Sequence, residues 1–317
     1  MSRIRLVALG LTILYAVAPA AGAPRQGGAF SAAVELVRLP AVVVDRAGVP
    51  VRGLTAADFV VTEDGRPQAI ASFTEGPPGE TVPLHLGLAL DKSISMEKDL
   101  PEAAEAAVTF INTFGEAADV TLVEFEAAIR VSRFAPPAYT QLFERIRDRK
   151  IGYGTVLYDA VARYLTEAES YTGQHVLVVF TDGGDSRSIK TLSQVIDALR
   201  RRNTIVYAIA YMNQPGSDGG VVPRASLSRM ARETGGEVFF PASPRDLVRI
   251  YQRILDEVAG RYTIGYVAPS QTPAPDGRDR FHRVAVRVAK PGLSGVVVRA
   301  RSGYVTTAPV RTSRTGS

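Results

Sequence analysis

The chain has 317 residues, of which 46% are hydrophobic and 22% charged, and these proportions exclude a protein that is disordered throughout. It has no cysteine, which excludes disulfides, a lipobox anchor and thiolate metal sites. The net charge of +5 is modest, and its densest basic run, residues 200–202, ends a predicted helix, where cations favour the helix dipole. A solvated helix end explains this run better than a phosphate-binding patch, and we expect no nucleic-acid partner.

Residues 1–23 are predicted to form a signal peptide. Arg3 and Arg5 precede an apolar run at residues 6–18, and small residues then allow cleavage, with the cut after Ala20 preferred. The run is shorter than the about 20 apolar residues that a membrane span needs. We therefore expect an exported protein, periplasmic or extracellular, with no transmembrane span beyond the signal segment. An uncleaved N-terminal anchor is the alternative.

Residues 30–78 are predicted to form an N-terminal β segment. Runs of β-branched residues are separated here by turn signals, and Asp64-Gly65 is typical of a hairpin turn between two strands. A segment with so few strands is marginal by itself.

Residues 83–267 are predicted to form an α/β domain. The apolar runs at 83–90 and 175–182 are typical of strands that are covered on both faces. Between and after them, apolar residues recur with helical spacing, most clearly along 247–258. Alternation of strands and helices predicts the α/β fold class, with a doubly wound and mostly parallel sheet.

Residues 268–306 are predicted to form a C-terminal β segment, and residues 307–317 a disordered tail. Alternation at Val284, Val286 and Val288 is typical of a strand with one buried face. Because two or three strands are marginal alone, we expect this segment to pair with the N-terminal one in a small β domain.

Oxygen-bearing side chains follow two of the buried strands. Asp91, Ser93 and Ser95 come after the first strand, and Asp182 ends another. Thr155 lies in a third loop, just before a predicted helix. Ligands bind at the carboxyl ends of the strands in open α/β sheets, so we expect these residues to lie close together.

These donors favour a hard divalent cation. All of them are oxygens, which suit Mg²⁺, Mn²⁺ or Ca²⁺ and not Zn²⁺ or Cu²⁺. Hydroxyl donors fit Mg²⁺ or Mn²⁺ better than Ca²⁺, which would want more carboxylates and carbonyls. Two carboxylates neutralise a divalent ion only formally, so the ion can still accept an anionic oxygen, such as a partner's carboxylate.

The three motifs resemble the metal-ion-dependent adhesion site of von Willebrand factor A domains. The D-x-S-x-S, the Gly-Thr before a helix and the T-D-G occur in that family's order. The flanks, with "VVVDRAGVPVRGLTAADFVVTEDGRPQAIASF", "YTIGYV" and "RARSGYV", are similar to secreted bacterial proteins related to this family, of the acidobacterial type. A degenerate domain that keeps the fold without the metal is the alternative. The resemblance implies a site for Mg²⁺, with Mn²⁺ or Ca²⁺ as alternatives, whose ligands are Asp91, Ser93, Ser95, Thr155 and Asp182.

Several charged neighbours of these motifs need an assignment. Lys92 either points away from the site or leans in, where it would weaken metal binding or pair with an incoming carboxylate. We expect Asp185 to act as an outer partner or a loop cap, and Glu124 and Glu126 to face solvent.

We expect a binding protein and not an enzyme, with a two-carboxylate phosphotransfer site as the catalytic alternative. The chain has no G-x-S-x-G, no phosphate-binding loop and no H-E-x-x-H. His85, His175 and His282 are expected to be strand-end or packing residues, and Asp91 and Asp182 lack a nearby general base. We expect cation-dependent binding of a protein that supplies an acidic residue to the metal. The alternative is a metal-independent scaffold that binds through its β domain.

Overall fold

The structure is a computed structural model, which describes residues 36–76, 82–115, 117–211, 221–243, 245–268 and 279–306. The expected signal peptide and C-terminal tail lie outside these ranges. The residues in these ranges belong to one compact unit. In the ranges described, no helix is long and apolar enough to cross a membrane.

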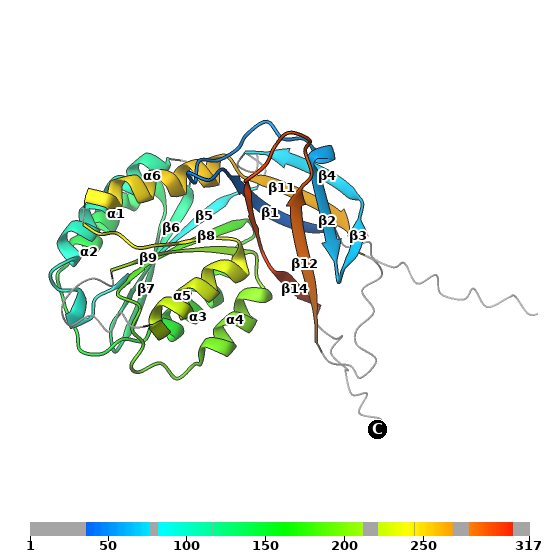
Figure 1. Cartoon of the computed structure of the whole chain (residues 1–317). Helices are drawn as coiled ribbons and strands as arrows, with labels where there is room; N and C mark the ends of the chain where they lie inside the picture. The colour runs from blue at the N-terminus through cyan, green and yellow to red at the C-terminus, as the bar shows by residue number, and fades with distance from the viewer. Residues whose placement is uncertain are drawn as a thin grey trace, which may run out of the picture. The chain divides into compact units, whose positions relative to one another are not determined.

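A six-stranded sheet forms the centre of the α/β part (Figure 1). Four neighbouring strand pairs are parallel, and β6–β7 is an antiparallel hairpin at one edge. All eight residues of both β5 and β8 are buried, as expected for strands with helices on both faces. The strands, in spatial order, are β10 (Val238–Phe239), β9 (Thr204–Ala210), β8 (Gln174–Thr181), β5 (Leu84–Asp91), β6 (Ala117–Phe125) and β7 (Ile129–Phe134).

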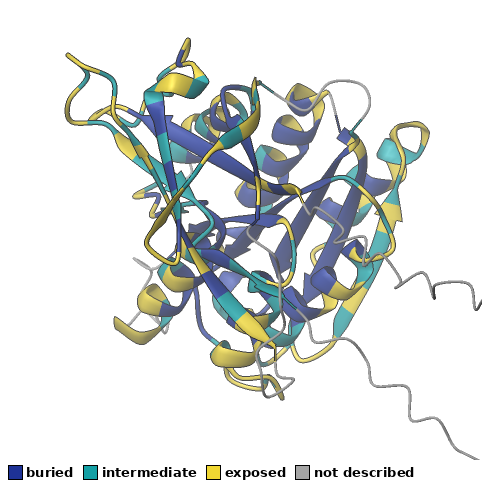
Figure 2. Cartoon of the chain, turned by 90° about the vertical axis from the view of Figure 1, so that its right-hand side faces the viewer, coloured by how far each residue is buried: buried dark blue, intermediate teal, exposed yellow. Residues whose placement is uncertain are grey.

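Helices cover both faces of this sheet (Figure 1), and Figure 2 shows its strands buried between them. One face packs against α1, α2 and α6, and the other against α3, α4 and α5. Gly87 of β5 lets α3 approach closely, since a Cβ there would lie 2.3 Å from the Tyr164 ring. The predicted doubly wound α/β class is therefore confirmed. The helices are α1 (Leu100–Phe114), α2 (Tyr139–Arg147), α3 (Leu157–Ala168), α4 (Leu192–Arg200), α5 (Val221–Thr234) and α6 (Arg245–Ala259), with short 3₁₀ turns η1 (Ala56–Asp58), η2 (Ile94–Met96) and η3 (Pro136–Ala138).

Two four-stranded sheets bring the N- and C-terminal flanks together. Strand β1 pairs antiparallel with β11 and β13, and β2 pairs antiparallel with β12. Strand β11, which the expected bounds place in the α/β domain, pairs in a flanking sheet instead of the central one. The first sheet has the order β13 (Val297–Ala300), β1 (Leu36–Val44), β11 (Tyr262–Val267) and β4 (Ile70–Glu75). The second sheet has the order β14 (Gly303–Thr306), β12 (Arg280–Val288), β2 (Phe59–Glu63) and β3 (Arg66–Gln68).

The flanking sheets share an apolar core of their own. Phe59 and Phe73 from the N-terminal flank contact Tyr262 from β11, with ring centroids 5.2 and 5.5 Å away. A polar contact also links the flanking sheets to the α/β part, because Arg299 of β13 pairs with the buried Glu257 of α6 at 2.6 Å. Side chains from both ends of the chain thus stabilise one β region.

Candidate functional site

Asp91, the last residue of β5, is fully buried. Its Oδ1 accepts a hydrogen bond from the backbone N–H of Ser93 at 2.9 Å, and its Oδ2 accepts one from Thr181 Oγ1 at 2.6 Å. The hydroxyl oxygens of Ser93 and Ser95 lie 3.1 Å apart on the same loop. The D-x-S-x-S motif thus turns its polar atoms toward one another at the end of the strand.

Asp182 follows β8, the parallel neighbour of β5. The two strands pair in register up to Leu90 and Phe180, so their carboxyl ends lie side by side. The bond from Thr181 to Asp91 links the two ends directly. Asp182 is buried, and its Oδ1 accepts from the N–H of Gly184 at 3.1 Å.

The loop that carries Thr155 is hydrogen-bonded to both of these strand ends. Gly152 donates its N–H to the carbonyl of Lys92 at 2.9 Å. The carbonyl of Thr155 accepts from the N–H groups of Ser186 and Arg187, both at 3.0 Å, and Thr155 N–H donates to Ser186 Oγ. The structure therefore brings together the three loops that carry the five predicted ligands.

Two further residues shape these loops. Gly154 has a φ of 93°, which favours glycine, and a Cβ there would lie 2.6 Å from Arg187 Cδ. Asp185 Oδ2 accepts from the N–H of Tyr158 in the first turn of α3 at 2.8 Å and from Ser188 Oγ at 2.6 Å. Asp185 thus caps α3, as predicted for a loop-capping residue.

The surroundings of Asp91 disfavour its charged form. Burial raises the pKa of Asp91 to about 7 and the negative charge of Asp182 adds to this, while hydrogen bonds from Ser93 and Thr181 oppose it. A divalent cation between the carboxylates would favour the ionised form instead. Two carboxylates with hydroxyls from Ser95 and Thr155 are a donor set that fits a hard cation.

Lys92 points away from Asp91 and is completely buried. Its Nζ lies 2.6 Å from Glu124 Oε1 and donates to the carbonyls of Asp148 at 2.7 Å and Arg145 at 3.3 Å. The expectation that Glu124 faces solvent is wrong, since it is 1% exposed and pairs with both Lys92 and Arg145. The buried ammonium requires this counter-ion, which explains why a glutamate lies inside.

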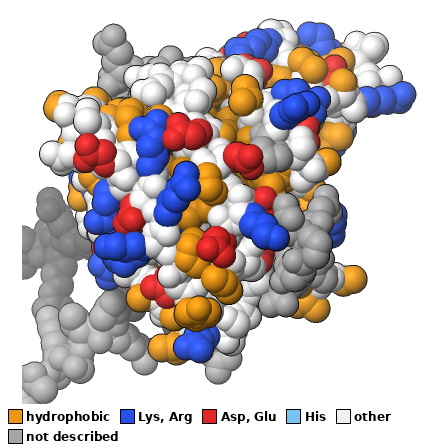
Figure 3. Space-filling view, turned by 90° about the vertical axis from the view of Figure 1, so that its left-hand side faces the viewer, with side chains coloured by type: hydrophobic (Ala, Val, Ile, Leu, Met, Phe, Trp, Pro, Cys, Tyr) orange, Lys and Arg blue, Asp and Glu red, His pale blue; other side chains and the backbone are white. Residues whose placement is uncertain are grey.

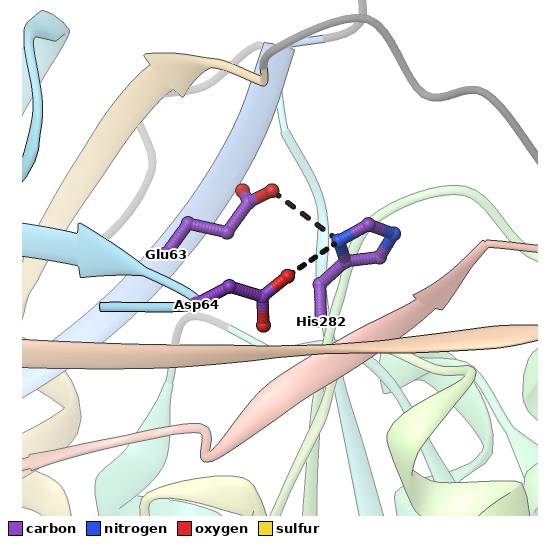
Figure 4. Close-up of side chains that lie close together, drawn as sticks. All are labelled: Glu63, Asp64 and His282. Atoms are coloured by element: carbon purple, nitrogen blue, oxygen red, sulfur yellow. Dashed lines mark ion pairs between the residues drawn. The ribbon is translucent and has the colours of Figure 1, made fainter. Parts of the chain in front are cut away.

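A second polar cluster has no counterpart in the sequence motifs. Glu63 and Asp64 at the end of β2 lie beside His282 of β12 in the flanking sheets (Figure 4). The ligand atoms of the three side chains lie within 4.8 Å of one another. Because His282 lies more than 200 positions from the adjacent Glu63 and Asp64, only the β2–β12 pairing brings the three together. The adjacent acidic pair before Gly65 is the one local feature of the sequence that could indicate this cluster.

The family model of the von Willebrand factor type A domain matches residues 85–253. No curated protein matches the chain.

Several solved structures are similar at low identity. A von Willebrand factor type A protein from Catenulispora acidiphila is 14% identical with a TM-score of 0.47, covering 86% of this chain and 74% of that one. The pilus adhesin SpaC from Lactobacillus rhamnosus GG is 9% identical with a TM-score of 0.48, covering 80% and 48%. The vWF domain of the pili tip protein Mfa5 from Porphyromonas gingivalis is 10% identical with a TM-score of 0.45, covering 55% and 94%.

Proposed function

Because the chain belongs to the von Willebrand factor type A domain family, we propose that its strand-end loops form a metal-ion-dependent adhesion site for a protein partner. The observation that carries this proposal is the meeting of three hydrogen-bonded loops around two buried carboxylates. Mg²⁺ is the proposed ion, with Mn²⁺ and Ca²⁺ as alternatives. The proposed ligands are Asp91, Ser93, Ser95, Thr155 and Asp182.

The charge balance of this site favours an acidic partner. Asp91 and Asp182 together cancel the formal charge of a divalent ion, and the serine and threonine hydroxyls add none. The bound ion would therefore remain electrophilic and could accept a carboxylate from outside. A glutamate or aspartate side chain of the partner protein would supply this carboxylate.

Exposed apolar side chains around the loops support a protein as the partner. Each loop carries one large example, namely Ile94 at 46% exposure, Tyr153 at 75% and Ile189 at 92%. The face at the α2 side of the molecule has apolar side chains interspersed with both signs of charge (Figure 3). Aromatic and apolar anchors within a polar surround are typical of protein interfaces.

The proposal assigns binding and not catalysis to this site. His85 and His175 lie near the starts of β5 and β8, about 20 Å from the carboxyl ends at 3.3 Å per residue. Neither imidazole can therefore serve as a base beside Asp91 or Asp182. Metal-dependent turnover of a phosphoester or peptide that is lost in Asp91→Ala would contradict this assignment.

The setting of the proposed activity is outside the cytoplasm. The N-terminal pattern supports export, to the periplasm or beyond the cell, where a divalent ion and a protein ligand are both accessible. A scaffold that binds through the flanking sheets is the rival, and it predicts binding that does not depend on metal.

Calorimetric titration of the chelator-treated protein with Mg²⁺ tests the proposal. We expect one bound ion, lost in Asp91→Ala and in Asp182→Ala while the circular dichroism spectrum is retained. Asp197→Ala removes an exposed carboxylate from α4 and should bind Mg²⁺ like the parent. Unchanged Mg²⁺ affinity in both site variants would contradict the proposed metal site. Partner capture that survives EDTA would favour the scaffold.

A further inference from the structure

We propose that Glu63, Asp64 and His282 form a second metal site, for a divalent transition ion of which Zn²⁺ is the first choice. The three side chains converge where the turn after β2 meets β12 (Figure 4). One imidazole and two carboxylates are donors that suit Zn²⁺. The site is independent of the strand-end loops and rests on none of their residues.

The distances between the donor atoms leave room for a metal ion. His282 Nδ1 lies 3.3 Å from Glu63 Oε1 and 3.4 Å from Asp64 Oδ2. Charge-assisted N–H···O bonds are shorter, at about 2.7–2.9 Å. A tetrahedral zinc ion with bonds of about 2.0–2.1 Å separates its ligands by about 3.3–3.4 Å. The two separations from the imidazole match that value, and the two carboxylate oxygens lie within 4.8 Å of each other.

Each carboxylate is held by its other oxygen, which leaves one oxygen facing the imidazole. Glu63 Oε2 accepts from the hydroxyls of Tyr266 at 2.5 Å and Tyr304 at 3.0 Å. Asp64 Oδ1 accepts from the backbone N–H of Arg283 at 2.9 Å. Outer hydrogen bonds of this kind orient metal ligands and raise their affinity.

His282 supplies a second observation, independent of the acidic pair. The residue is 6% exposed, and neither ring nitrogen forms a hydrogen bond with the described residues, although Nδ1 lies within ion-pair distance of both carboxylates. Nδ1 points between the two carboxylates (Figure 4). The ring stacks on Tyr304, with centroids 5.0 Å apart and planes 16° from parallel, and this stacking sets its orientation. A buried nitrogen aimed at two carboxylates is costly without an ion or proton between them.

The site has a route to solvent on the side of Asp64, whose side chain is 34% exposed. The guanidinium of Arg280 lies 3.4 Å from Asp64 Oδ2 on that side and competes for the same oxygen. Three protein ligands leave a fourth tetrahedral position for water. Because Glu63 and Asp64 come from the N-terminal flank and His282 from the C-terminal one, a bound ion would join the two flanks.

Zinc binding is measured on the full chain carrying Asp91→Ala and Asp182→Ala, so that the strand-end site can no longer bind metal. After chelator treatment, calorimetric titration with Zn²⁺ should give one equivalent and raise the melting temperature. Asp64→Asn should weaken binding by more than the roughly 10–100-fold that loss of an outer partner costs. Asparagine also tolerates the φ of 48° at this turn, so this variant should fold.

Three further variants sharpen the result. His282→Phe keeps the stacking on Tyr304 and should abolish binding. Tyr304→Phe should weaken it by about 10–100-fold, and Arg280→Gln should tighten it. The proposal is overturned if the Asp91→Ala/Asp182→Ala chain binds no Zn²⁺, or if adding Asp64→Asn leaves the Zn²⁺ affinity unchanged. Since the strand-end ligands are already absent, failure here leaves the adhesion-site proposal untouched.

Discussion

Asp91 and Glu124 are buried carboxylates at the carboxyl ends of adjacent strands, β5 and β6, yet they are stabilised differently. Glu124 pairs with the buried Lys92 and with Arg145. None of the ion pairs among the described residues involves Asp91, which is held by a backbone N–H and a hydroxyl. The protein therefore neutralises Glu124 with its own cations, whereas the described residues provide no such partner for Asp91.

Lys92 separates these two environments, although it follows Asp91 directly in the chain. Successive side chains of an extended strand point to opposite faces, so the ammonium lies on the other side of the backbone from the Asp91 carboxylate. Its bonds to Glu124, to the carbonyl of Arg145 in the last turn of α2 and to the carbonyl of Asp148 just after α2 keep it there. The positive charge inside the motif is therefore directed away from the proposed metal site.

The largest expected effect comes from breaking the Lys92 cluster. Lys92→Met leaves Glu124 buried with only the half-exposed Arg145, and removing one partner of a buried pair costs about 3–5 kcal/mol. Urea denaturation should show this loss. The double variant Lys92→Met/Glu124→Leu should recover much of it, because apolar replacement of a buried pair is often neutral. A single variant as stable as the parent would contradict the proposed role of the pair.

The pH dependence of metal-free stability should isolate Asp91. Its pKa rises from 3.8 in the unfolded chain to about 7 in the fold, so the folded state holds the proton more tightly. Stability should therefore fall as the pH rises from about 4 to about 7, by up to about 4 kcal/mol at 1.36 kcal/mol per tenfold change in proton affinity. Urea denaturation in EDTA measures this fall, and Asp91→Asn should remove it. Identical pH profiles for parent and variant would be inconsistent with a buried, uncompensated Asp91.

Magnesium should offset the cost of ionising the buried Asp91 and leave the Lys92 cluster unaffected. At a Mg²⁺ concentration 100 times the Kd, binding to the folded state alone contributes about 2.7 kcal/mol. We expect this gain at neutral pH in the parent and in Lys92→Met, but not in Asp182→Ala. Thermal unfolding with and without Mg²⁺ measures it, and an equal gain in Asp182→Ala would place the ion elsewhere.

The smallest expected effect distinguishes loop support from metal ligation at Asp185. Asp185→Ala removes the acceptor for Tyr158 N–H at the start of α3, and loss of such a cap costs about 1 kcal/mol. Chemical denaturation should show that loss, while calorimetry should still show one bound Mg²⁺. Loss of Mg²⁺ binding with unchanged stability would assign Asp185 to the ion.

The central sheet and its strand-end motifs were predictable because their signals are local. Eight consecutive buried residues make β5 and β8 visible as apolar runs, and parallel pairing places their carboxyl ends at one edge. The pairing of the flanks followed from the marginal stability of a few strands alone, although its register, such as Val284 opposite Glu63, depends on tertiary packing.

Buried charges were harder to predict. Glu124 lies in a strand where alternate residues can face solvent, and only the distant Arg145 and the turned side chain of Lys92 explain its burial. The sequence around His282 indicates a packing residue, since its neighbours in space, Glu63 and Asp64, lie far away in the chain. In both cases the partner belongs to another element, and a local pattern contains no signal for it.

The antiparallel pairing of β1 has a consequence for the order of assembly. Both of its neighbours, β11 and β13, lie beyond residue 261. During synthesis β1 emerges first but has no strand to join until the whole α/β part has been made. Sequence-distant pairings of this kind slow folding and leave strand edges exposed meanwhile. Strand β1 is therefore among the earliest segments of the described chain to be translated and among the last to pair with its neighbours.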